Sequence, residues 1–198
     1  MTEDLPADQG PATAPASGEL VIVRHADTDW TVQGRHTGRT DLPLNEAGRA
    51  KALALRGRLA GRTFATVWSS PLVRARETAR LAGFDPTERT ELLEWDYGAY
   101  EGLTSPQIRE LRPGWDLWRD GCPGGEDAGD LARRADALLA TLPPRGDVVA
   151  FSHGHMLRVL TARWLGLPAP DGALFALAPG GIGVLGHEQQ RRVLRSWS

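Results

Sequence analysis

Two histidines each follow a short apolar run that is typical of a buried strand. The first run, 20–24, leads directly into His25, and the second, 147–152, leads into His153. Because the carboxyl ends of neighbouring parallel strands meet in one crevice, the two imidazole rings can lie close together there. A neutral ring nitrogen is a competent nucleophile, so we predict that His25 attacks an electrophilic atom in this crevice.

Two arginines are expected at the same crevice, and they indicate which electrophile it receives. Arg24 precedes His25, and Arg74 lies in the first turn of a helix that follows a third predicted strand. A guanidinium donates paired hydrogen bonds to two oxygens, and helix N-terminal amides add a favourable dipole, so the crevice is suited to a phosphoryl group. Two fixed positive charges also keep the His25 imidazole neutral. With His153, the arginines can neutralise the phosphoryl oxygens without a metal.

A departing alkoxide needs a proton, and the middle of the chain offers three carboxyl groups for this step. They are Glu94, Asp96 and Glu101, of which we prefer Glu94. After the alcohol has left, the same group as a carboxylate can activate the water that hydrolyses the phosphohistidine. One residue can therefore serve both half-reactions.

The spacing of His153 and His155 also occurs in metal sites. The sequence contains no cluster of Asp, Glu and His that would complete such a shell, so we predict no metal and no other cofactor. His155 is expected to be structural or to lie behind the reacting groups. Arg76 lies two positions after Arg74 and so points elsewhere, where we expect it to form a surface ion pair.

The elements that must position these residues alternate along the chain. Strands are predicted at 20–24, 66–69 and 147–152, and helices at 45–59, 72–82, 128–142 and 156–165. This alternation predicts an α/β fold, a three-layer α/β/α sandwich with a mostly parallel central sheet. Asn45 is the expected N-cap of the first helix, and Ser70 with Pro71 the expected start of the second. The segment 173–197 is predicted to form two or three strands, broken at Gly180 and Gly181.

The length of 198 residues fits one domain. Residues 1–18 are rich in Pro, Ala, Asp and Ser without apolar periodicity, so we predict a disordered tail before a single domain at 19–198. The segment 88–126 is dense in Trp, Gly and Pro, and it is the predicted lid over the crevice.

Composition limits the partners and the compartment. The formal charge of −2 gives no sequence-independent reason to expect nucleic acid or an anionic membrane, so the predicted partner is a small phosphorylated metabolite. Cys122 is the only cysteine and cannot form an internal disulfide. The N-terminus has no pattern of a secretory leader, and no run of about 18 apolar residues occurs, so a cytoplasmic location is predicted. The sequence does not indicate an oligomeric state.

Four blocks of the sequence, in this order, resemble the histidine phosphatase superfamily in its phosphoglycerate-mutase-like branch. Residues 24–28 resemble the Arg-His-Gly-x-Thr signature, and 69–79 resemble the second phosphate-binding block. Residues 92–98 resemble the block that carries the acid, and 152–154 the block that carries the second histidine. The resemblance extends from Leu20 to the C-terminus and implies a phosphoglycerate-mutase-like fold.

The resemblance also implies a role for individual residues. His25 would be the nucleophile, Glu94 the acid and base, and Arg24, Arg74 and His153 the phosphate ligands. The further contacts to substrate or phosphate would come from Thr31, Thr37, Gly38, Tyr97 and Gly154. Two positions depart from the pattern of the branch: Ala26 replaces the usual Gly, which requires a negative φ, and Thr31 replaces a frequent Asn.

A narrower resemblance concerns the substrate. Residues 37–44, 115–122 and 180–185 resemble a subgroup that contains fungal sedoheptulose-1,7-bisphosphatase and actinobacterial broad-range acid phosphatases, which points to sugar phosphates. A phosphoglycerate mutase is the alternative, although Ser105 stands where similar mutases carry a nearby Lys. A non-catalytic phosphate-binding module on the same fold is a further alternative.

Overall fold

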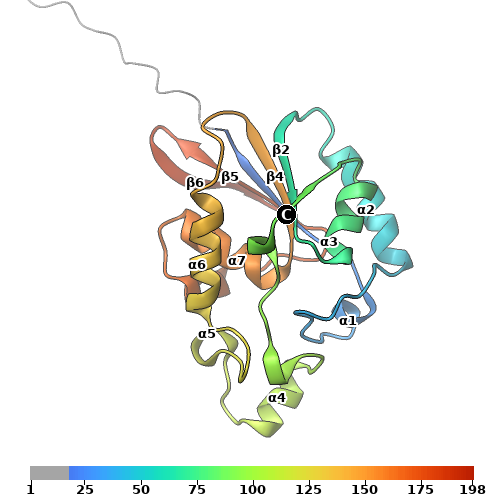
Figure 1. Cartoon of the computed structure of the whole chain (residues 1–198), viewed down its shortest axis with the longest axis vertical. Coiled ribbons are helices and arrows are strands. Elements are labelled where there is room, and N and C mark those ends of the chain that lie inside the picture. Colours follow the sequence, from blue (N-terminus) through green and yellow to red (C-terminus); the bar gives the residue numbers. More distant parts are fainter. Residues whose placement is uncertain (1–17) are drawn as a thin grey trace, which may run out of the picture.

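Six strands form the central sheet of the computed structural model, which describes residues 18–198. The strands are β1 (Leu20–Arg24), β2 (Phe64–Ser69), β3 (Thr87–Glu88), β4 (Asp147–Ser152), β5 (Ile182–Glu188) and β6 (Arg191–Trp197). Their order across the sheet is β3-β2-β4-β1-β5-β6 (Figure 1). The strands β1 to β4 are parallel, whereas β5 is antiparallel to both of its neighbours, β1 and β6. The prediction of a mostly parallel sheet is confirmed. The tail predicted at 1–18 lies almost wholly outside the described residues.

Helices cover both faces of this sheet. One face carries α2 (Glu46–Arg58) and α3 (Val73–Leu81), and the other carries α6 (Ala128–Leu139) and α7 (Gly154–Trp164) (Figure 1). Alternate residues of β1 point to opposite faces, so Val21 belongs to an apolar cluster with Leu55 of α2, while Ile22 belongs to a second cluster with Leu157 of α7. The three-layer prediction is therefore confirmed. Among residues 18–198, no helix has the length and apolar character needed to cross a bilayer.

Several predicted boundaries need correction. Asn45 caps α2 as predicted, because its side chain accepts a hydrogen bond from Gly48 N–H. Ser70 and Pro71 do not begin α3, which has Leu72 as its N-cap and starts at Val73. The helix predicted at 128–142 ends at residue 139, and the one predicted from 156 begins at residue 154.

The C-terminal segment forms only two strands, because 173–181 contains no strand. Gly180 adopts φ of +74°, and its N–H donates to the carbonyls of Arg24 and His25 at 3.1 Å. A chain that turns at this position to reach the end of β1 cannot also extend as a strand. The segment therefore fastens the end of β1 instead of lengthening the sheet.

The segment 88–126 contributes large apolar side chains to the core on one face of the sheet. It contains η1 (Thr90–Leu92), η2 (Gly98–Tyr100), α4 (Ser105–Leu111) and α5 (Leu117–Asp120), while α1 (Asp29–Val32) and η3 (Ala169–Leu174) lie outside it. Trp95, Tyr97 and Trp115 are buried in the same cluster as the inner sides of α6 and α7. Apolar burial of these large rings holds the segment against that face of the domain.

Candidate active site

His25 is held at the end of β1 with a defined proton position. Its backbone N–H donates to Ser152 O at 2.8 Å, and its side chain is buried. Nδ1 lies 2.7 Å from Ala26 O. Because a carbonyl only accepts hydrogen bonds, Nδ1 carries the ring proton of the neutral imidazole, and Nε2 presents a lone pair.

The loop after His25 tolerates Ala26 in place of glycine. Gln189 is the only non-glycine residue with positive φ among residues 18–198, so Ala26 meets the condition set by the sequence. Its N–H donates to Thr78 Oγ1 at 3.1 Å, and Thr78 Oγ1 donates to Arg74 O at 2.7 Å. These bonds tie the loop after His25 to α3.

Burial and two arginines determine the charge of His25. Burial lowers the pKa of His25 well below its ordinary value of 6.5, and the charges of Arg74 and Arg24 lower it further. The buried ring of His153 and the partly buried ring of His155 also have a pKa well below 6.5, chiefly because loss of solvent disfavours the charged form. All three imidazoles are therefore neutral at pH 7.

This shift predicts how stability depends on pH. Below pH 6.5 the unfolded chain protonates histidines that stay neutral in the folded protein, so the free energy of unfolding should fall by about 1.4 kcal/mol per pH unit for each of the three. Above 6.5 their contribution should be constant. Urea unfolding at pH 7.5, 6.5 and 5.5 measures how the free energy of unfolding changes with pH. His25→Ala should lower this slope by about 1.4 kcal/mol per pH unit, the contribution of one proton. A wild-type slope that is flat between 6.5 and 5.5 would contradict the assignment.

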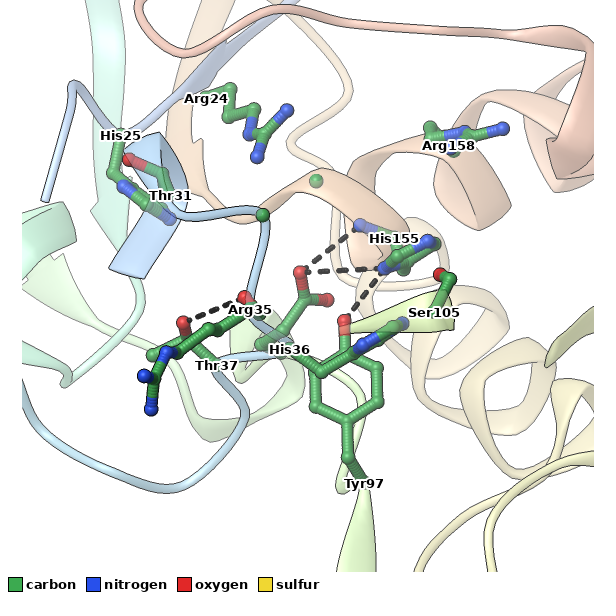
Figure 2. A pocket seen from close by; sticks show the side chains of 13 residues that line it. Arg24, His25, Thr31, Arg35, His36, Thr37, Tyr97, Ser105, His155 and Arg158 are labelled. Carbon is green, nitrogen blue, oxygen red and sulfur yellow. Dashed lines mark hydrogen bonds and ion pairs between the residues drawn. The ribbon is translucent and has the colours of Figure 1, made fainter. Parts of the chain in front are cut away.

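A cavity of about 250 Å³ opens next to His25 (Figure 2). The predicted site residues that line it are Arg24, His25, Thr31, Thr37, Glu94, Tyr97 and Gly154. The residues that the sequence analysis missed are Gly34, Arg35, His36, Ser105, His155 and Arg158. His155 and Arg158 follow His153 on the first turns of α7, so their spacing offered a signal, whereas His36 lies in a loop that offered none.

Arg24 offers donors to this cavity. Nη1 donates to Leu177 O at 2.6 Å, while Nε is buried and has no partner. A Cβ at Gly154 would lie 3.1 Å from Arg24 Cζ, so a larger residue there would press on the guanidinium. Among residues 18–198, Nη2 has no protein partner and is not one of the fully buried donors, so it is the nitrogen of this guanidinium that can bind an oxyanion in the cavity.

His153 and Arg74 lie beside His25 but behind the cavity lining. The His25 and His153 ring centroids are 5.2 Å apart. His153 Nδ1 accepts from Arg74 Nε at 3.2 Å, and its Nε2 lies 2.7 Å from Ser70 Oγ. Three of the other four donors of Arg74 bond to the carbonyls of Thr37, Gly38 and Thr40. The four groups do converge as predicted, and direct contact of His153 and Arg74 with phosphate stays a prediction.

Two further predicted contacts serve local structure. Thr31 Oγ1 accepts from Thr28 N–H and donates to Thr28 O, which completes a capping box of α1. Gly38 does not line the cavity, because its N–H donates to Glu101 and its carbonyl accepts from Arg74. A Cβ at Gly38 would lie 2.5 Å from Trp95 O, so close packing explains glycine at this position.

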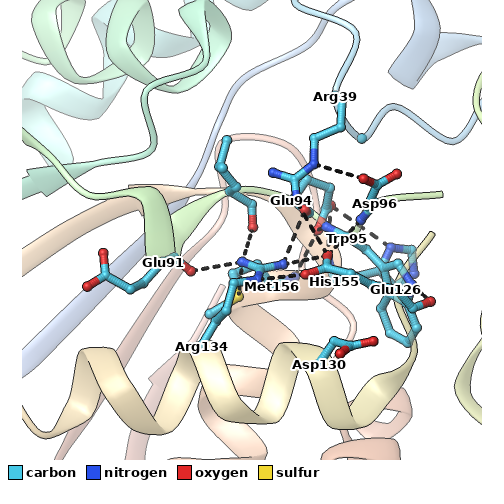
Figure 3. Close-up of polar contacts among 12 residues, drawn as sticks. Arg39, Glu91, Glu94, Trp95, Asp96, Glu126, Asp130, Arg134, His155 and Met156 are labelled. Atoms are coloured by element: carbon cyan, nitrogen blue, oxygen red, sulfur yellow. Dashed lines mark hydrogen bonds and ion pairs between the residues drawn. The ribbon is translucent and has the colours of Figure 1, made fainter. Parts of the chain in front are cut away.

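Glu94 is the only one of the three candidate acids that lines the cavity. Oε1 accepts from the N–H groups of Trp95 at 2.8 Å and Met156 at 3.0 Å, and Oε2 accepts from His155 N–H at 3.1 Å (Figure 3). The carboxyl group thus sits at the positive end of α7. Asp96 is paired with Arg39, and Glu101 accepts the amides of Gly38 and Thr40.

Arg134 of α6 holds the backbone around Glu94. Its Nη1 donates to Glu91 O at 2.9 Å and Leu93 O at 2.7 Å, and its Nη2 lies 3.3 Å from Glu94 O and 2.8 Å from Glu126 Oε2 (Figure 3). One guanidinium therefore joins α6 to the chain on the N-terminal side of Glu94. We refer to this set of bonds as the Arg134 clamp.

Two sequence expectations lie at the margin of the site. Arg76 forms the expected ion pair, with Glu88 at 2.9 Å. Burial raises the pKa of Cys122 to about 12, so its thiol is not nucleophilic near neutral pH.

No group of three or more His, Cys, Asp or Glu side chains suited to a metal ion occurs within residues 18–198.

Comparison with known proteins identifies relatives along nearly the whole described chain. A family model described as the histidine phosphatase superfamily (branch 1) matches residues 20–198. The acid phosphatase of Mycobacterium tuberculosis is 43% identical over 182 residues, covering 88% of this chain and 89% of that protein. The sedoheptulose 1,7-bisphosphatase of Saccharomyces cerevisiae is 32% identical over 183 residues, covering 74% of this chain and 67% of that protein.

A solved structure of a mycobacterial glucosyl-3-phosphoglycerate phosphatase superposes on this fold with a TM-score of 0.80. It is 32% identical in sequence, and the match covers 91% of this chain and 98% of that one. The order of the strands, the paired histidines and the matched family model agree with one another. The chain therefore belongs to branch 1 of the histidine phosphatase superfamily.

Proposed function

We propose that the protein is a phosphomonoesterase that transfers a phosphoryl group from a small phosphorylated metabolite to His25 and then to water. The observation that carries this proposal is the proton position of His25: Nδ1–H is bonded to Ala26 O, so the lone pair of Nε2 is available at the cavity. The guanidinium of Arg24, which also lines the cavity, supports an oxyanion as the reacting group.

In the first half-reaction, the Nε2 lone pair attacks phosphorus, and the bond from phosphorus to the ester oxygen breaks. Glu94 Oε2 is the oxygen suited to give its proton to the departing alkoxide, because it accepts one amide hydrogen bond whereas Oε1 accepts two. Arg24 binds the phosphoryl oxygens, and Arg74 adds a buried positive charge behind His153.

In the second half-reaction, water attacks the phosphohistidine. The Glu94 carboxylate takes a proton from this water, the N–P bond breaks, and its electron pair returns to Nε2. Inorganic phosphate leaves, and His25 is again neutral. No step requires a metal ion, since the charge on the phosphoryl oxygens is balanced by guanidinium groups.

Sugar phosphates are the proposed substrate class, supported by relatives named for sedoheptulose bisphosphate and glucosyl-3-phosphoglycerate. We also propose that 88–126 acts as the lid and that Thr31, Thr37, Tyr97 and Gly154 border the bound substrate, since all four line the cavity. A cytoplasmic location is proposed from the single, buried Cys122. At position 105, where similar mutases carry a nearby Lys, the cavity is lined by Ser105, which favours hydrolysis over mutase activity.

Phosphate release tests the proposed function. The protein, with excess EDTA, is incubated separately with 3-phosphoglycerate, p-nitrophenyl phosphate and a panel of sugar phosphates. We expect inorganic phosphate from p-nitrophenyl phosphate and from at least one sugar phosphate. Conversion of 3-phosphoglycerate to 2-phosphoglycerate without phosphate release would instead identify a mutase. Absence of phosphate release from every compound would reject hydrolysis, and loss of activity in EDTA would reject the metal-free mechanism.

A further inference from the structure

The side of the cavity away from His25 is formed by three aromatic polar residues, His36, Tyr97 and His155, which we call the distal wall. Figure 2 shows these side chains grouped together, with His25 on the opposite side of the view. The His36 and His155 rings are parallel within 7°, with centroids 6.3 Å apart. The mechanism above uses neither imidazole, so the distal wall is available for the part of the substrate that leaves.

The ring proton of His155 lies on Nε2. Tyr97 Oη and His155 Nδ1 are 2.6 Å apart, and burial raises the pKa of Tyr97 well above its ordinary range, so the phenol keeps its hydrogen. This buried hydroxyl needs an acceptor, and Nδ1 is the one within hydrogen-bond distance. Tyr97 therefore donates to Nδ1. The neutral His155 ring carries its hydrogen on Nε2 as a consequence.

His36 has the opposite arrangement. Its Nδ1 lies 2.9 Å from Leu103 O and must donate, and burial lowers the pKa of His36, so its Nε2 carries a lone pair. Among residues 18–198, neither Nε2 atom has a protein partner, and neither is one of the fully buried polar atoms that lack one. Both Nε2 atoms are therefore open to the cavity. The wall offers one neutral donor and one neutral acceptor.

This combination matches hydroxyl groups better than a second anion. A hydroxyl both donates and accepts, whereas a phosphate or carboxylate only accepts and would meet the lone pair of His36. Arg158 also borders the cavity, but its Nε and Nη2 donate to Gly172 O and Ala173 O, and its guanidinium stacks on Trp118 at 4.7 Å. Arg35 is exposed at the rim and lies over Trp30.

We propose that His36 and His155 are specificity-determining residues that bind hydroxyl groups of a polyhydroxylated leaving alcohol, His155 Nε2–H as donor and His36 Nε2 as acceptor. This inference rests on the proposed function, because it assigns part of the same cavity to the alcohol that the phosphatase reaction releases. Tyr97 is a positioning residue in this arrangement, since its hydroxyl determines which nitrogen of His155 bears the proton.

Substrate pairs test the inference through a ratio rather than through activity alone. For wild type, His155→Leu and His36→Leu, kcat/KM is measured with a sugar phosphate and with p-nitrophenyl phosphate, whose leaving group has no alcohol hydroxyls. We expect each variant to lower the ratio of kcat/KM for the sugar phosphate to kcat/KM for p-nitrophenyl phosphate by about 3- to 10-fold, the effect expected for one neutral hydrogen bond. His155→Gln, which restores an N–H donor, should recover most of the ratio. His187→Leu, on β5 near the opposite end of the sheet, is the matched control.

Deoxy analogues of the sugar phosphate complete a cycle with these variants. Removing a hydroxyl that His155 binds should lower kcat/KM of the wild type but leave kcat/KM of His155→Leu unchanged. An unchanged ratio of kcat/KM values in both variants would overturn the inference. A loss of kcat/KM restricted to sugar bisphosphates would also overturn it, because the distal wall would then bind a second anion. Nitrogen-15 NMR gives an independent readout: a proton on Nδ1 of His155 would contradict the assignment. If wild type releases phosphate from no compound, the proposed function fails instead.

Discussion

Replacing His25 with alanine is expected to lower kcat by about 10³-fold or more, because the variant has no nitrogen on which the phosphoryl group can be carried. The variant should also fail to acquire a label from substrate that carries radioactive phosphate. In wild type, rapid acid-free quenching should trap a phosphoryl group that is stable in alkali and lost in acid, as expected of phosphohistidine. Phosphate release and label are measured on the same samples.

The His25→Ala result needs a control that separates chemistry from folding. Arg76→Ala removes a guanidinium of α3 whose partner is Glu88 of β3, and it should keep both turnover and label. Thermal unfolding should show that both variants fold. Alkali-stable label in His25→Ala would place the covalent intermediate on another residue, and the mechanism would have to be abandoned.

Glu94→Gln is expected to slow the complete reaction by about 10²- to 10⁴-fold, since glutamine can neither give a proton to the alkoxide nor take one from water. The loss should depend on the leaving group. p-Nitrophenolate leaves readily without a proton, so its first half-reaction should be less affected than that of a sugar phosphate. The phosphohistidine should then accumulate, which a burst of p-nitrophenol followed by slow turnover would reveal.

Asp96→Asn is the matched control for Glu94→Gln. Asp96 was among the candidate acids, but it pairs with Arg39 and does not line the cavity, so its amide variant should show neither the burst nor the large loss. Equal losses with both substrates and no accumulated intermediate in Glu94→Gln would exclude Glu94 as the acid and base. A burst in Asp96→Asn would transfer that role to Asp96.

Much of the fold could be predicted because it depends on local patterns. The apolar runs at β1 and β4 end at His25 and His153, and their parallel pairing places Arg24 opposite Ser152, so convergence of the two rings follows from the pattern of buried strands. The start of α3 could not be predicted in the same way. The hydroxyl of Ser70 contacts His153, a residue far away in the sequence, and it does not cap the helix.

The lining of the cavity was predicted less completely, because its residues come from loops whose positions depend on tertiary contacts. His36 reaches the distal wall only because its backbone pairs with Leu103 and Gly102. Resemblance to a family supplied Thr37 and Tyr97, whereas His155, which was expected to be structural or to lie behind the reacting groups, lines the cavity. Sequence patterns also do not reveal that the donors of Arg74 are already bonded to three carbonyls.

The Arg134 clamp has a consequence for how this enzyme can be altered. One guanidinium fastens the chain that carries Glu94, the proposed acid and base, to α6, so the position of this carboxyl group depends on Arg134. The part of the cavity lining that contains Arg35 and Ser105 is not hydrogen-bonded to Arg134. Directed evolution toward new substrates should therefore succeed with libraries at Arg35 and Ser105, whereas randomising Arg134 should impair every substrate alike.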